Sequence, residues 1–182
     1  LYMEKPVIFF SHAHKDKEPL LVLKNAILKA TGKTVQVFSS SDGQSIPFGK
    51  NWVAELGDAL EICKLMFVFV TPNSISSNWI YFEAGHAYAK GIKVVPIGLG
   101  IDLNSINPPL GHLQGFNLNS QETTKNIFRI INDTCNTEFS ENYPELYERV
   151  ISASDTILKS SLSGMIEDAK LKVSVSDNYD LI

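Results

Sequence analysis

The fold is decided by the run Leu65-Met66-Phe67-Val68-Phe69-Val70, which is followed at once by Thr71-Pro72-Asn73. Six consecutive apolar residues, several of them aromatic or β-branched, predict a strand that is buried on both faces. The turn residues that follow end the strand. Because such a strand belongs in the middle of a parallel sheet covered by helices, the run predicts an α/β fold.

Segments on either side of this strand extend the same pattern. Apolar runs predict further strands at residues 7–10, 34–38 and 94–97, with a short edge strand at 116–118. Helical spacing of apolar residues predicts helices at 16–30, 52–62, 78–90, 121–135 and 143–162. Alternating strands and helices of this length form right-handed parallel crossovers. We therefore expect a flavodoxin-like open parallel sheet of four to five strands, with helices on both faces and further C-terminal helices.

Composition narrows the classes of function. The 182 residues suffice for one sizeable core, and 16 basic against 20 acidic residues give a net charge of −4. No basic tract favours nucleic-acid binding, no apolar run has the length of a membrane span, and the N-terminal residues lack the three-part pattern of a signal peptide. Cys63 and Cys135 have neither metal-ligand nor CxxC spacing. We expect a cytoplasmic protein without a metal site, bound to neither membrane nor nucleic acid.

An acid interrupts the apolar helix predicted at residues 78–90. The helix begins near Asn78, and most of its other residues are apolar or aromatic, so we expect it to be buried on most sides. Glu83 therefore needs a reason to be there. Spacing of four places it on one face with Trp79, which suggests a small-molecule site. The alternative is an ordinary ion pair of Glu83 with His86 or Lys90 on a solvated stripe.

Topology brings this acid to a binding edge. In open parallel sheets, ligands bind outside the carboxyl ends of the strands. The predicted strands end at Ser11, at Ser39 and before Asn73, and the last of these turns leads into the helix that carries Glu83. The position of Glu83 thus supports the functional interpretation independently of its neighbours.

These residues together resemble a Toll/interleukin-1 receptor (TIR) domain over residues 5–135. The matching parts are the first strand with its Ser11-His12 turn, the loop at residues 42–49, the third strand with its turn, and the spacing Trp79-x-x-x-Glu83. Bacterial members often carry this form of the motif. The resemblance implies a TIR-like domain at 5–137, followed by a helical extension at 138–171 and a tail at 172–182. The start Leu1-Tyr2-Met3 is compatible both with a natural start at Met3 and with a cut from a longer protein.

The resemblance also implies an activity. In the enzymatic branch of the family the matching glutamate cleaves NAD, so Glu83 is the expected catalytic residue and Trp79 its aromatic partner. A carboxylate near the ribose stabilises the oxocarbenium-like charge that develops when nicotinamide leaves. The chain lacks GxGxxG and P-loop motifs, so NAD is expected as a substrate, with no cofactor. A stand-alone, Thoeris-like bacterial immunity protein would make an ADP-ribose-derived signal for a separate effector.

Further site residues are predicted from the strand ends and loops. The expected substrate-binding residues are Phe10, Ser11, Ser39, Asp42, Asn73 and Trp79. For Phe10 the competing role is plain core, and for the polar residues it is a turn or cap. His12 and His14 are weaker acid–base candidates, for which a surface role is the alternative. Self-association is expected through an interaction loop that contains Ile46, Pro47 and Phe48.

Two other functions remain open from the sequence. Many TIR domains only assemble signalling complexes, and in that case the apolar residues of the interaction loop would form a docking knob. A nucleoside deoxyribosyltransferase-like enzyme has a similar fold and also cleaves an N-glycosidic bond. The first strand and the loop around Pro47 argue against that third possibility.

Overall fold

The described residues form a five-stranded parallel sheet. The structure is a computed structural model that describes residues 5–39, 57 and 60–155. The strand order is β2-β1-β3-β4-β5, and each neighbouring pair is parallel. This order is the flavodoxin-like one, so the predicted fold class is confirmed. The strands are β1 (Val7–Ser11), β2 (Gln36–Ser39), β3 (Cys63–Val70), β4 (Lys93–Gly98) and β5 (Phe116–Asn117).

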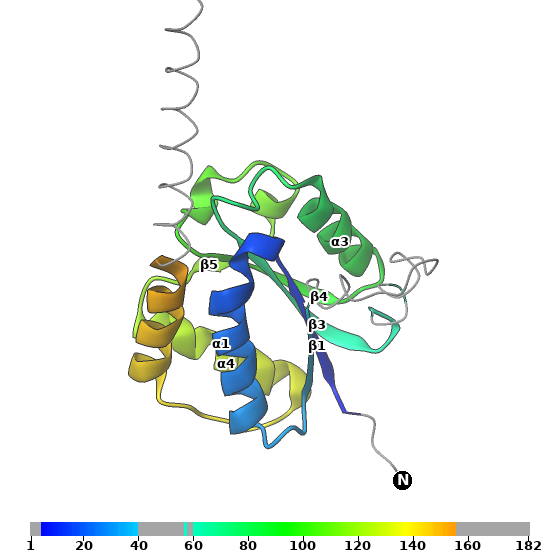
Figure 1. Cartoon of the computed structure of the whole chain (residues 1–182). Coiled ribbons are helices and arrows are strands. Elements are labelled where there is room, and N and C mark those ends of the chain that lie inside the picture. The colour runs from blue at the N-terminus through cyan, green and yellow to red at the C-terminus, as the bar shows by residue number, and fades with distance from the viewer. Residues whose placement is uncertain (1–4, 40–56, 58–59, 156–182) are drawn as a thin grey trace, which may run out of the picture.

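Helices cover both faces of the sheet (Figure 1). They are α1 (Lys17–Ala30), α3 (Asn78–Ala89), α4 (Gln121–Cys135) and a helix at 143–155, with short 3-10 turns η1 (His14–Asp16), η3 (Leu103–Ser105) and η4 (Leu110–His112). Helices α1, α4 and 143–155 lie on one side and α3 lies on the other (Figure 1). Alternate residues of β3 supply the two cores, which explains why this strand has no polar face. Leu65, Phe67 and Phe69 belong to one core and Met66, Val68 and Val70 to the other.

Most predicted boundaries agree with the structure to within about two residues. Strand β3 begins at Cys63, earlier than predicted, and β2 begins at Gln36 and includes Ser39. Helix α4 has the predicted ends. Ser120 and Thr123 form a reciprocal capping box at its start, and Asn136 in the left-handed conformation follows its last residue. The helix at 143–155 packs Leu146 and Val150 into the same core as α1 and α4.

Several predictions fall outside the described residues. These are the loop with Asp42 and the interaction-loop residues Ile46, Pro47 and Phe48, together with the segment after residue 155. Of the helix predicted at 52–62, only residues 57 and 60–62 are described, of which 57, 60 and 61 are helical. In the described part of the chain, no helix combines the length and apolar character needed to cross a bilayer.

Candidate active site

Helix α3 places Glu83 against the sheet. The buried residues of this helix are Ile80, Glu83, Ala84 and Ala87, and Glu83 has 0% of its surface exposed. The expectation that α3 is buried on most sides is wrong. Trp79, Phe82 and Tyr88 are 37%, 45% and 66% exposed, because the helix packs on the sheet through one side only. The buried acid and the exposed aromatic residues therefore belong to the same helix.

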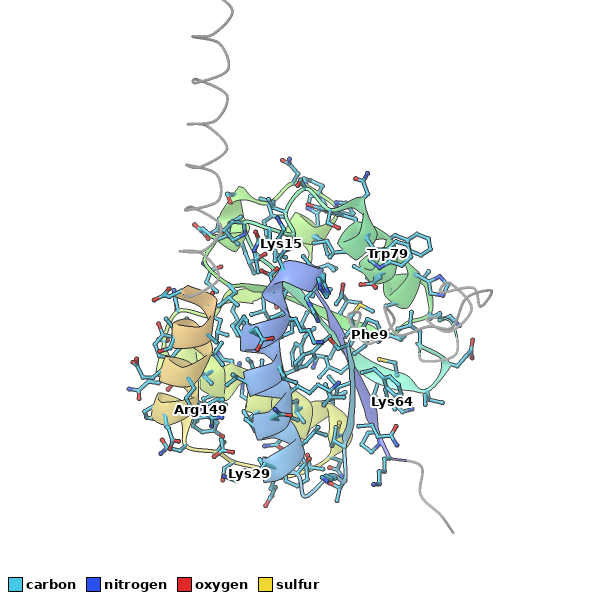
Figure 2. The ribbon with its side chains drawn as sticks, in the orientation of Figure 1. Phe9, Lys15, Lys29, Lys64, Trp79 and Arg149 are labelled. Atoms are coloured by element: carbon cyan, nitrogen blue, oxygen red, sulfur yellow. The ribbon has the colours of Figure 1, made fainter. Side chains whose placement is uncertain are left out.

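Both carboxylate oxygens of Glu83 accept hydrogen bonds. Ser11 Oγ, at the carboxyl end of β1, donates to Oε2 in a short buried contact. Trp79 Nε1, one helical turn before Glu83, donates to Oε1 over 2.7 Å. One partner is thus fixed in the sheet with 0% exposure, while the other extends from α3 at the surface (Figure 2). The expected pairing of Trp79 with Glu83 is direct contact, not mere proximity.

Burial changes the acidity of this carboxyl group. Desolvation raises the pKa of Glu83 from 4.5 to about 7, and the hydrogen bonds from Ser11 and Trp79 oppose that rise. A carboxyl group with a pKa near neutrality can change charge when a charged ligand arrives. Such perturbed groups occur preferentially at functional sites, although structural networks also produce them.

The ordinary ion-pair alternative for Glu83 is not what the structure shows. Lys90 instead pairs with the exposed carboxylate of Glu61. His86 packs its ring at 6.2 Å from that of Phe82, and its buried Nε2 has no hydrogen-bond partner in the described structure. Glu83 is therefore held by Ser11 and Trp79, rather than by a cation on a solvated stripe.

Phe10 does not reach this site. It is fully buried in the core below α1, with its ring 4.9 Å from that of Phe69 and 6.1 Å from that of Phe67. Successive residues of a strand point to opposite faces, so Ser11 faces α3 while Phe10 faces away. Phe10 therefore has the core role that the sequence left as its alternative, and it does not contact the site around Glu83.

A second pair of polar residues joins the ends of β1 and β2. His12 Nε2 lies 2.6 Å from Ser39 Oγ, and His12 Nδ1 donates to the Ala13 carbonyl oxygen over 2.7 Å. His12 is only 4% exposed, so its expected surface role is wrong, whereas His14 is exposed. The Nδ1 proton leaves Nε2 of a neutral ring as an acceptor for the Ser39 hydroxyl.

Asn73 belongs to a different polar network. Its Nδ2 donates to Asp16 Oδ1 over 2.7 Å, and Thr71 Oγ1 donates to Asp16 Oδ2 over the same distance. Thr71 Oγ1 also accepts from the backbone N–H groups of Asn73 and Ser74. The side chain of Asn73 thus has the turn-fixing role that was the alternative to substrate binding. Asp16 and Thr71 were not singled out from the sequence, because their contact spans 55 positions.

An apolar cavity lies on another side of α3. Its volume is about 240 Å³, and its lining residues are Tyr81, Ala84, Gly85, Tyr88, Pro109, Leu110, His112 and Leu113. No lysine or arginine is among these described residues, so the cavity offers no cation for a pyrophosphate. It also lacks Glu83, and we do not assign it to the site.

The comparisons with known proteins identify the family. The family model for the TIR domain matches residues 8–131. The chain belongs to the TIR domain family. This family includes both NAD-cleaving enzymes and modules that assemble signalling complexes. Comparison with curated proteins found no match.

One solved TIR structure agrees with the fold, and two others are similar at lower TM-scores. The TIR domain of the Toll-related receptor TRR-2 from Hydra magnipapillata has 14% identity and a TM-score of 0.54, over 71% of this chain and 98% of that one. The TIR domains of the activated Roq1 resistosome, which recognises the pathogen effector XopQ, have 15% identity and a TM-score of 0.44, over 82% and 84%. A TIR-STING receptor from C. gigas, in complex with 2',3'-cGAMP, has 16% identity and a TM-score of 0.48, over 82% and 41%. At 14% identity, the similarity to the TRR-2 domain concerns the fold alone.

Proposed function

We propose that this TIR protein cleaves NAD between nicotinamide and ribose, with Glu83 as the catalytic carboxylate. The observation that carries the proposal is a fully buried carboxylate held by Ser11 and Trp79 at the carboxyl edge of the sheet. That edge is where ligands of open parallel sheets bind.

The chemistry needs one carboxylate. As the bond between C1′ and the nicotinamide nitrogen breaks, its electron pair goes to the nitrogen, and nicotinamide leaves as a neutral molecule. The ribose carbon then carries oxocarbenium-like positive charge, which ionised Glu83 stabilises. Water, or a nucleophile of the same substrate, forms the new bond at C1′ and loses a proton. The positive charge of the bound nicotinamide ring also favours the ionised form of Glu83.

The product and the setting rest on the family resemblance. We propose an ADP-ribose-derived signal, cyclic or otherwise rearranged, that activates a separate effector in bacterial antiphage immunity. Cyclisation requires a closed site in which the adenine reaches C1′ before water does. Self-association through Ile46, Pro47 and Phe48 would complete the site between copies, and Ser39 and Asp42 remain proposed substrate contacts.

One experiment tests the proposed reaction. The protein is incubated with NAD at high protein concentration, and the products are separated and weighed by mass spectrometry. We expect nicotinamide release by the wild type and none above background by Glu83→Gln. The matched control is Glu61→Gln, which removes an exposed carboxylate of the same type paired with Lys90. Equal turnover by Glu83→Gln and the wild type would contradict the catalytic role of Glu83.

The second candidate is a TIR module that only assembles complexes. The exposed aromatic side chains of Phe82 and Tyr88 on α3 favour it, because such residues are enriched at protein interfaces. This function predicts concentration-dependent assembly without nicotinamide release at any protein concentration. The same incubation, followed by size-exclusion chromatography, separates the two functions.

A further inference from the structure

Three aromatic rings of α3, those of Trp79, Phe82 and His86, form a row beside the proposed site. The rings of Trp79 and Phe82 stack with centroids 5.2 Å apart and planes 28° apart. The ring of Phe82 continues to that of His86 at 6.2 Å with planes 30° apart. Residues three and four apart on a helix are neighbours, so this row of rings follows one side of α3. Phe82 is 45% exposed and is absent from both apolar cores, so it has little share in holding the fold.

The two donors to Glu83 differ in how firmly they are held. Ser11 is part of β1, is fully buried, and can hardly move without moving the sheet. Trp79 lies in the first turn of α3 and is 37% exposed, so its side chain is less enclosed than that of Ser11. Its indole keeps Nε1 on Glu83 Oε1 only in one orientation. The stacked ring of Phe82 contacts the indole and favours that orientation.

We infer that Phe82 is a positioning residue, which holds the Trp79 indole against Glu83 and thereby sets the orientation of the carboxylate. The inference rests on the proposed function for its kinetic consequences, but the contact itself can be tested without substrate. Phe82 acts through Trp79 and does not take part in bond breaking. Its loss should therefore lower kcat more than it raises KM.

The kinetic test compares Phe82→Ala, Phe82→Tyr and a control. Loosening Trp79 weakens one hydrogen bond to the carboxylate, and we expect kcat at neutral pH to fall about tenfold. The pH midpoint of kcat/KM should move upward, because the hydrogen bond from Trp79 favours the ionised form of Glu83. Phe82→Tyr keeps the stacked ring, so its kcat and its pH midpoint should equal those of the wild type. Tyr88→Ala removes a more exposed aromatic ring of the same helix and should change neither.

A spectroscopic test separates this inference from the proposed function. Trp52→Phe leaves Trp79 as the only tryptophan of the chain. In that background, Trp79 fluorescence should change with pH around a midpoint near 7, because its partner carboxyl titrates there. Adding Phe82→Ala should weaken the transition and make the indole more accessible to acrylamide. Adding Phe82→Tyr should not.

The outcomes decide the two proposals separately. If the wild type releases no nicotinamide but Phe82→Ala weakens the fluorescence transition, the enzyme proposal fails and the positioning role stands. If the fluorescence transition and acrylamide quenching are unchanged in Phe82→Ala, Phe82 does not position Trp79. If Phe82→Ala keeps wild-type kcat and pH midpoint in an active enzyme, the positioning role is overturned.

Discussion

Glu83 and Asp16 are both buried carboxylates at the carboxyl edge of the sheet, with 0% and 4% of their surface exposed. Each accepts two hydrogen bonds from uncharged side chains. The donors of Asp16 are Thr71 and Asn73, which both belong to the turn after β3. One donor of Glu83 lies deep in the sheet, whereas the other is an exposed indole. The first arrangement ties a loop to a helix start, and the second leads from the interior to the surface.

The comparison shows that burial alone does not identify a functional acid. In the Asp16 network, Thr71 Oγ1 also binds two backbone N–H groups, and Ser74 Oγ donates to the carbonyl oxygen of Phe69. These contacts join the turn after β3 to the start of α1, and their role is to fix the loop. Glu83 has a partner on the solvent side, so a ligand can approach along the indole. Function is expected where the network is open.

The largest expected effect separates the two acids by activity. Glu83→Gln should lower NAD cleavage by about a thousandfold or more, roughly 4 kcal/mol of transition-state stabilisation. The glutamine can keep both contacts, since its oxygen accepts from Trp79 and its amide donates to the Ser11 hydroxyl. Asp16→Asn, assayed where it is folded, should keep kcat within about twofold, because the hydrogen-bond partners of Asp16 fix a turn and are not donors to Glu83. The check is steady-state nicotinamide release. An inactive but folded Asp16→Asn would place Asp16 in the site.

The next effect is a pH-dependent stability that belongs to Glu83. Its pKa is raised from 4.5 to about 7 on folding, so its contribution to stability is fully present below pH 4.5 and is lost as the pH rises through 7. The loss amounts to about 3 kcal/mol. Urea unfolding of the wild type and Glu83→Gln from pH 4.5 to 8.5 measures it. The variant should gain stability relative to the wild type as the pH rises, and parallel curves would contradict the shift.

Replacing the structural acid Asp16 should lower stability instead of raising it. Asp16→Asn places an amide N–H group against one of the two donors from Thr71 and Asn73, which leaves a buried polar group unsatisfied. We expect a loss of about 2 kcal/mol in the free energy of unfolding. Urea unfolding at pH 7 checks this value, with the exposed Asp155→Asn as the matched control. A variant as stable as the wild type would show that the network does not hold the turn.

The fold could be predicted because its strongest signals are local. The apolar run of β3 and the alternation of strands and helices determine a doubly wound sheet whatever the loops do. The burial of Glu83 could be predicted because an acid stands in an otherwise apolar helix that follows the carboxyl end of a strand. The contact of Asp16 with Thr71 and Asn73 could not, because crossover geometry brings together residues more than fifty positions apart.

The errors have equally physical causes. Strand β1 is buried on both faces, so its pattern does not tell which residues face α3, and the structure places Phe10 in the core on the α1 side. Helix α3 was expected to be buried on most sides because it is rich in apolar residues. Large apolar side chains are also common at surfaces, so the sequence does not separate a core ring from an exposed one such as Phe82.

The smallest expected effect concerns the hydroxyl of Ser11, the buried donor to Glu83. Ser11→Ala removes the buried donor to Glu83 Oε2, which favours the ionised carboxylate, so the pKa of Glu83 should rise further. Because catalysis needs the ionised form of Glu83, a higher pKa lowers the activity at acidic pH. At pH 6 kcat/KM should fall about tenfold, while at pH 9 it should approach the wild-type value.

The matched control is Ser74→Ala, another buried serine, which belongs to the Asp16 network and should reduce stability without moving the pH profile. Full pH profiles of nicotinamide release distinguish the two variants. A loss for Ser11→Ala that is the same at every pH would mean that Ser11 binds the substrate directly, as the sequence first suggested, and does not act through Glu83.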